Sequence, residues 1–199
     1  MIWLMLVPAY FLGTFPSAVM IARSKGVDIT KVGSGNPGAS NIARTFGAKW
    51  GVLVFVLDGL KGFIPAGVAL LLTERPSPAA YGMAAAAVLG PMFPVTRRFK
   101  GGKGVATIGG ACIALQPIIF LALTAVWFVV RKLTGKASLG SLMITFGFPL
   151  GVWILGGPGW EIATAAALGA LVLLRHLENI KRLLSGRELS ASRHEHVAE

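Results

Sequence analysis

Residues 105–130 read VATIGGACIALQPIIFLALTAVWFVV and contain no charged side chain. An uncharged apolar run of about 18 residues or more is typical of a membrane-spanning helix. As one helix this run would be about 39 Å long, and the basic residues that follow it would lie on the opposite side of the membrane. Pro117 lies near its middle, where a proline removes a helical hydrogen bond. The stretch therefore predicts a hairpin of two short or tilted arms, broken near Gln116 and Pro117.

The rest of the chain is equally apolar. Hydrophobic residues make up 54% of the sequence and charged residues only 14%, and the charged residues are clustered. Once the apolar runs are assigned to lipid, too little chain remains for a soluble domain. We therefore expect one all-α transmembrane domain over residues 1–199. The other runs are Ile2–Ala22, Trp50–Thr73 (interrupted by Asp58 and Lys61), Ala79–Thr96, Ala137–Trp160 and the shorter Ile162–Leu174.

Basic residues collect in a few short connections, which indicates topology. Under the positive-inside rule these connections face the cytoplasm. With the hairpin counted as two crossings, this predicts seven transmembrane segments, with the N-terminus outside and the C-terminus inside. The formal net charge of +11 is thus explained without a nucleic-acid partner. The predicted cytoplasmic loops are residues 23–49, 97–104 and 131–140, and the tail is residues 175–199.

The first of these loops has the composition of an anion-binding site. Residues 33–41 read GSGNPGASN, and Arg44 follows. Glycines let backbone N–H groups converge on an anion, and serine and asparagine add donors. The glycine spacing also matches the dinucleotide fingerprint, but that fingerprint requires a preceding strand, whereas apolar helical runs flank this loop. A flexible connector is the alternative; the density of Ser, Asn and Arg favours phosphate binding. The candidates are Gly33, Ser34, Gly35, Asn36, Ser40, Asn41 and Arg44.

A second loop, KGGKGVAT at 100–107, places Lys103 among glycines at the start of a helix. It lacks the Walker A pattern, but helix N-termini favour anions. We expect Gly102, Lys103, Gly104 and Thr107 to contact a phosphate. Arg97, Arg98 and Lys100 are assigned a topological role only.

Further polar residues near these loops leave alternatives open. Asp58 and Lys61 lie three residues apart within a span, either as functional groups or as a neutralising pair that positions the first loop. His176 and Asn179 share a helical face at the membrane surface, as substrate contacts or structural groups. Ser138 and Ser141 can donate to a phosphate or cap a helix. His194 and His196 are expected to be solvated.

At these residues the sequence resembles the bacterial acyl-phosphate:glycerol-3-phosphate acyltransferases of the PlsY type. The resemblance covers nearly the whole chain. It departs at Pro91, where the family commonly has histidine, and at Ser40 and Leu177, where threonine and a polar residue are usual. The matching blocks are GSGNPGASN with Arg44, LDGLKG at 57–62, FKGGKGVAT at 99–107, SLGS at 138–141 and RHLENIKRLLSGRE at 175–188.

The resemblance implies a seven-helix enzyme of the bacterial inner (plasma) membrane, with its active site at the cytoplasmic face. It implies transfer of a fatty acyl group from acyl phosphate to the 1-hydroxyl of glycerol 3-phosphate, giving lysophosphatidate and phosphate for phospholipid synthesis. No cofactor or metal is implied, and the substrate's own phosphate can accept the hydroxyl proton. A transporter or channel for a phosphorylated solute is the alternative. The ordered motifs favour the enzyme, acting as a monomer among membrane lipids.

The resemblance and the composition of the loops together assign the site. Ser34, Arg44 and Lys103 are predicted to act on the phosphates. The remaining predicted substrate contacts are Gly33, Gly35, Asn36, Ser40, Asn41, Lys61, Gly102, Gly104, Thr107, Ser138, Ser141, His176 and Asn179.

Overall fold

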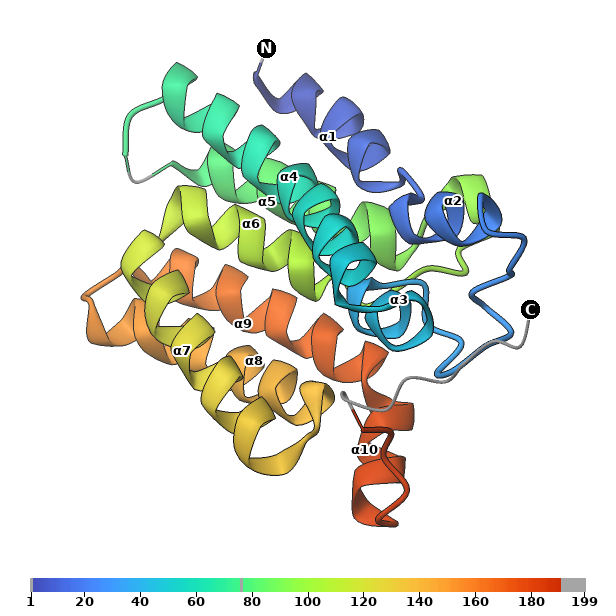
Figure 1. The fold of residues 1–199 in the computed structure, drawn as a ribbon. Helices are drawn as coiled ribbons and strands as arrows, with labels where there is room; N and C mark the ends of the chain where they lie inside the picture. Colours follow the sequence, from blue (N-terminus) through green and yellow to red (C-terminus); the bar gives the residue numbers. More distant parts are fainter. Residues whose placement is uncertain (1, 76, 191–199) are drawn as a thin grey trace.

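The computed structural model describes residues 2–75 and 77–190, and helices dominate them (Figure 1). His194 and His196 lie outside the described residues. Short 3₁₀ turns occupy Ile2–Met5 and Val95–Arg97. The α-helices are α1 (Leu6–Gly13), α2 (Ser17–Arg23), α3 (Ala39–Phe46), α4 (Ala48–Leu72), α5 (Pro78–Met92), α6 (Val105–Leu115), α7 (Pro117–Thr134), α8 (Ala137–Ile154), α9 (Gly159–Arg175) and α10 (Leu177–Leu184).

Five helical segments of the described chain are long and apolar enough to cross a membrane alone, and α9 with α10 forms a further, bent pair. Helix α6 is apolar but shorter. The all-α, multi-pass membrane fold predicted from the sequence is confirmed. The count of seven crossings and their orientation stay predictions. The five segments are Ile2–Arg23, Ala48–Leu72, Pro78–Arg97, Pro117–Thr134 and Ala137–Ile154.

The predicted break in the uncharged run is present, because α6 ends at Leu115 and α7 begins at Pro117. Of the two arms predicted to be short or tilted, α6 is short, whereas α7 is longer than predicted because it continues through Arg131 and Lys132 to Thr134. Charged side chains alone do not end a helix. Helix α7 ends at Gly135, which adopts a left-handed conformation (φ 68°), and the Gly135 N–H donates to Arg131 O to close the last turn.

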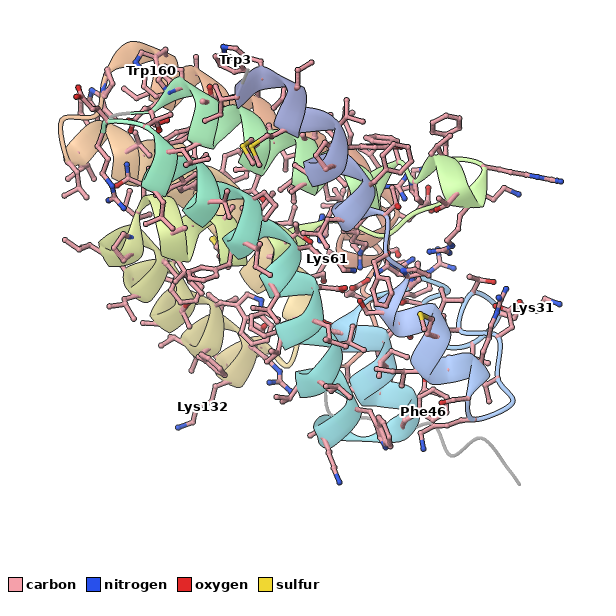
Figure 2. All side chains as sticks on the ribbon, turned by 90° about the horizontal axis from the view of Figure 1, so that it is seen from above. Trp3, Lys31, Phe46, Lys61, Lys132 and Trp160 are labelled. Atoms are coloured by element: carbon pink, nitrogen blue, oxygen red, sulfur yellow. The ribbon has the colours of Figure 1, made fainter. Side chains whose placement is uncertain are left out.

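The four basic regions gather at one end of the bundle. We call this the motif end; it is made of residues 24–38, 98–104, 135–136 and 185–190. The opposite end carries residues 73–75, the α6–α7 junction and residues 155–158. In Figure 2, Trp3 and Trp160 lie toward the opposite end, whereas Lys31, Phe46 and Lys132 lie toward the motif end. Tryptophan is enriched at both membrane–water interfaces, so the basic residues and not the tryptophans distinguish the two ends.

Helix α4 packs against α6 by direct backbone contact. A Cβ atom on Gly110 of α6 would lie 1.8 Å from the carbonyl oxygen of Gly59, and one on Gly62 of α4 would lie 1.9 Å from that of Thr107. Only glycine fits at such distances. In lipid, where apolar surface gives no drive between helices, close packing of small residues holds them together. The contact fixes the short helix α6 against the long helix α4.

The predicted orientation can be tested with reporter fusions. A reporter placed after Lys136 should report cytoplasm, and one placed after Arg75 should report the external side, because the basic loops favour the inside. Enzymatic activity of compartment-specific reporters measures both. An external reporter after Lys136 would mean that the α6–α7 hairpin does not return the chain, and the number of crossings would fall to six.

The glycine contact predicts an asymmetric response to alanine. Gly110→Ala places a methyl group against the Gly59 backbone, and overpacking of this kind costs about 1–3 kcal/mol. We expect a lower yield of monodisperse protein and a lower Tm in detergent. Gly67→Ala on α4 is the control, since no atom lies within 4 Å of its added Cβ. Equal thermal stability of the two variants would contradict this account of the contact.

Candidate active site

A cavity of about 420 Å³ opens at the motif end, within the usual size range of ligand pockets. All but three of the predicted site residues line it. The three that do not are Gly33, Gly35 and Lys61. Those that do are Ser34, Asn36, Ser40, Asn41, Arg44, Gly102, Lys103, Gly104, Thr107, Ser138, Ser141, His176 and Asn179.

Asn41 organises the first motif loop rather than offering free donors. Its side-chain Oδ1 accepts from Ser34 N–H at 3.0 Å, and its Nδ2 donates to Val32 O at 3.0 Å. Gly33, at φ 57°, lies so close that a Cβ atom there would be 2.3 Å from Asn41 Oδ1. The glycine thus shapes the loop around Asn41, and Ser34 lies at the cavity wall.

Arg44 is buried, with 6% of its surface exposed, and still lines the cavity. Its Nη1 donates to Asn41 Oδ1 at 3.2 Å, and its Nε donates to the Ser190 carbonyl at 3.0 Å. The guanidinium is therefore held in one orientation by α3 and by the segment after α10. A fixed fork of N–H groups is well suited to a phosphate.

The second motif loop is anchored through its backbone. Gly102 N–H donates to Pro91 O at 2.8 Å, while Arg175 donates from Nε to Gly102 O at 2.9 Å and from Nη2 to Gly101 O. Pro91 also lines the cavity. Pro91 thus holds the loop through its main-chain carbonyl, a contact that does not depend on its side chain.

Lys103 is the most perturbed cation of this loop. Its ammonium donates to Asn179 Oδ1. Burial, together with the charges of Arg182, Arg175 and Arg44, lowers the pKa of Lys103 to about 8, against the opposing charge of Glu188. The ammonium is still mostly protonated at pH 7, but burial and the neighbouring cations destabilise its charge, and a bound anion would stabilise it.

His176 lies between α9 and α10 with 2% of its surface exposed. Burial, and then the charge of Lys103, lowers the pKa of His176 to about 4, so the ring is neutral at pH 7. Its Nδ1 lies 2.8 Å from Val172 O, and a carbonyl can only accept, so Nδ1 carries the proton. No buried side-chain nitrogen among the described residues lacks a partner; Nε2 therefore faces the cavity as an acceptor. His176 was predicted as a substrate contact, and with the proton on Nδ1 its free ring nitrogen can only accept a hydrogen bond.

Glu188, which we did not predict from the sequence, joins several predicted donors. Its Oε1 accepts from Ser138 Oγ at 2.7 Å and from Asn179 Nδ2 at 2.6 Å, and its Oε2 accepts from Arg182 Nε at 2.8 Å. Burial opposes ionisation, but these hydrogen bonds outweigh it and lower the pKa of Glu188. Lys136 also donates to the Glu188 carbonyl.

The helix-capping alternative for Ser138 and Ser141 is wrong. Ser138 donates to Glu188, and Ser141 Oγ donates back to Ala137 O at 3.1 Å while accepting from Trp127 Nε1 at 3.4 Å.

The sequence offered one signal for Glu188, which is a carboxylate among basic residues in the last motif. Its partners are distant in sequence, so only the fold reveals them.

Lys61 belongs to a buried ion pair and not to the cavity wall. Its ammonium donates to Asp58 Oδ1 at 2.5 Å and to Phe15 O at 2.6 Å, and Ser17 Oγ donates to the same Asp58 oxygen at 2.9 Å. The structure thus favours the neutralising pair over the predicted substrate contact. The pair fixes the break between α1 and α2, because Phe15 lies in that break and Ser17 begins α2. Helix α2 leads into the first motif loop.

The cavity continues from its polar end into an apolar groove between α4, α6, α7 and α8. Val52 and Phe55 of α4 and Phe128 of α7 line it near the motif end and are themselves exposed on the outer surface. An exposed apolar surface on a membrane helix faces lipid, so this groove is accessible from the side. The described residues hold no group of three or more His, Cys, Asp or Glu side chains arranged to bind a metal ion.

A basic, donor-rich pocket at the mouth of a lipid-accessible groove defines a class: a membrane-embedded protein that handles an amphiphile with a phosphate head. Comparison with known proteins gives the family. The sequence model of the glycerol-3-phosphate acyltransferase family matches residues 3–186. This chain belongs to that family. The family is one of enzymes, and the alternative of a transporter or channel is therefore discarded.

Individual relatives cover nearly the whole chain. A glycerol-3-phosphate acyltransferase of Aquifex aeolicus is 45% identical over 180 residues, covering 90% of this chain and 94% of its own. One from Syntrophotalea carbinolica is 39% identical over 187 residues, covering 94% and 95%. Both relatives are named for the same activity.

Solved structures agree with the fold. The crystal structure of PlsY, an integral membrane glycerol 3-phosphate acyltransferase, in its glycerol 3-phosphate form superposes with a TM-score of 0.92 at 43% identity, covering 95% of this chain and 94% of that one. The lysophosphatidic acid form gives a TM-score of 0.88 at 44% identity, covering 94% of each chain.

Proposed function

We propose that this chain transfers a fatty acyl group from acyl phosphate to the 1-hydroxyl of glycerol 3-phosphate. The products are lysophosphatidate and inorganic phosphate, in bacterial phospholipid synthesis. The observation that carries the proposal is the position of Lys103, a partly buried cation near other cations, where the polar pocket meets the apolar groove. The structures of relatives in glycerol 3-phosphate and lysophosphatidic acid forms support the same substrate and product.

Within this proposal, Ser34, Arg44 and Lys103 bind phosphate. Arg44 supplies oriented N–H groups, Lys103 a compact charge, and Ser34 a hydroxyl beside a glycine-rich turn. The neutral Nε2 of His176 accepts a hydrogen bond from a substrate hydroxyl. Asn41, Asn179 and Glu188 hold these groups in place. Preorganised donors aimed at developing charge are the largest contribution that such a site makes to catalysis.

The reaction requires no covalent enzyme intermediate, because acyl phosphate is a mixed anhydride with a good leaving group. The 1-hydroxyl oxygen attacks the acyl carbonyl carbon, the bond between that carbon and the phosphate oxygen breaks, and phosphate departs. At a pKa of about 4, His176 is a weak base. The hydroxyl proton passes instead to a phosphate oxygen of the substrate, and the enzyme supplies positioning.

The site is proposed to face the cytoplasm at the inner (plasma) membrane, because the basic loops of the motif end favour the inside. The acyl chain enters from surrounding lipid through the side of the groove. The monomer is proposed as the catalytic unit, because Ser34, Arg44 and Lys103 of one chain already line the same cavity.

The donor assignment is tested with purified protein. Acyl phosphate with glycerol 3-phosphate should release phosphate and form lysophosphatidate, whereas acyl-CoA should not support the reaction, because a phosphate head is needed at Lys103. Phosphate release and lipid product are measured together. Equal rates with acyl-CoA would rule out the proposed donor.

The role of Lys103 is tested by substitution and by pH. Lys103→Ala should lower kcat by about 10²–10³, while Lys100→Ala, an exposed lysine of the same loop, should stay active. Because the pKa of Lys103 is lowered to about 8, kcat/KM for glycerol 3-phosphate should fall above about pH 8 as the free enzyme loses this proton.

Lys103→Arg keeps its charge at high pH. It should therefore show low activity without the alkaline decline. An unchanged alkaline limb in Lys103→Arg would assign that titration to another group. Size-exclusion profiles of the detergent-solubilised variants separate lost catalysis from lost folding.

A further inference from the structure

The apolar groove has a closed end. Helices α6 and α7 diverge from their junction at Gln116 toward the motif end (Figure 1). Side chains of both helices line the cavity, whose polar residues lie at the motif end. Toward the junction the groove is lined by Cys112 of α6, Phe120 of α7 and Phe148 of α8.

These three residues form a packed wall. Cys112 and Phe148 are 4% and 6% exposed and belong to a hydrophobic cluster with Ile119 and Val152, against which Phe120 packs. The side opening, by contrast, lies near the motif end. A chain that enters from the polar pocket therefore runs past the opening and meets the wall.

A buried polar network behind the wall holds the junction in place. Gln116 Nε2 donates to Tyr81 Oη at 3.0 Å and to Glu161 Oε2 at 3.1 Å, and Tyr81 Oη donates to Glu161 Oε2 at 3.0 Å. The network ties α5, the α6–α7 junction and α9 together. Unsatisfied polar groups in lipid are costly, so separating these helices at the junction would be unfavourable.

The wall lies at a limited depth below the phosphate site. Helix α6 begins at Val105, two residues after Lys103, and seven steps of about 1.5 Å take it to Cys112, about 10 Å deeper. One leaflet of the roughly 30 Å hydrocarbon core is about 15 Å deep. The wall therefore lies within the depth of one leaflet, where it can meet the end of an acyl chain whose head is bound at the phosphate site.

We propose that Cys112, Phe120 and Phe148 form the end wall of the acyl groove and set the longest acyl chain that the enzyme uses efficiently. This inference rests on the proposed function, since it concerns the acyl donor. The residues proposed to determine specificity for chain length lie apart from the groups proposed to bind phosphate.

Two substitutions should move the wall in opposite directions. Phe148→Ala removes a ring from the wall and should raise kcat/KM for arachidoyl phosphate relative to palmitoyl phosphate by about tenfold or more. Gly109→Ala adds a methyl group whose nearest neighbour is Phe120 Cε2 at 3.7 Å, an ordinary contact. It should narrow the groove and lower the same ratio.

Each variant has a matched control. Phe146→Ala removes the same ring from a lipid-facing position on α8, where Phe146 is 58% exposed. Gly67→Ala adds the same methyl group in open space on α4. Both controls should keep the chain-length profile of the unaltered protein, measured with dodecanoyl, palmitoyl and arachidoyl phosphates.

The outcomes are distinct. If Phe148→Ala and Gly109→Ala are active with an unchanged profile, the acyl chain leaves through the side opening and the wall proposal is overturned, while the proposed function stands. If Phe148→Ala does not fold, Gly109→Ala alone decides. If the unaltered protein uses no acyl phosphate at all, the proposed function fails, and the wall's role with it.

Discussion

The backbone contact between α4 and α6 is the constraint on which the site depends. Gly62 and Gly110 have no side chains to keep the two helices apart, so Gly62 meets the Thr107 carbonyl and Gly110 meets Gly59. Helix α6 is too short to cross a membrane alone and gains its position from this contact. Lys103 lies two residues before the start of α6. Arg44 lies in α3, which directly precedes α4. The glycine contact therefore sets how far apart the two phosphate-binding groups lie.

Once the helices are placed, buried polar groups must find partners within the protein. At the motif end, Glu188 fulfils this need for Ser138 and Asn179, and Asn179 in turn accepts from Lys103. A carboxylate thus holds the ammonium group indirectly, through an amide. Direct pairing would neutralise Lys103 and leave it unavailable to a phosphate, whereas the intervening Asn179 fixes its position and preserves its charge.

The sequence predicted much of this because lipid imposes simple rules. Uncharged runs marked the helices, and Pro117 marked the break between α6 and α7, since a proline cannot continue the hydrogen-bond pattern. The motif loops lined the cavity as expected. Two site residues were not placed correctly from the sequence. The pair of Lys61 with Asp58 is local and was one of two alternatives, but the contact of Lys61 with the Phe15 carbonyl, 46 residues away, depends on the fold. Glu188 likewise joins Ser138, 50 residues away, and no local pattern contains that contact.

Those tertiary contacts also explain why a site this basic can exist in a folded membrane protein. Lys103 lies near Arg44, Arg175 and Arg182, with Glu188 as the opposing charge that acts on it. Burial and mutual repulsion destabilise the charged lysine, and a pKa of about 8 is the result. A bound phosphate would offset the repulsion, because it supplies negative charge to several cations at once, and it would raise the pKa of Lys103. Substrate binding is thus linked to the protonation of Lys103. Because the cations repel one another without a bound anion, a head group with two negative charges should bind more tightly than one with a single charge.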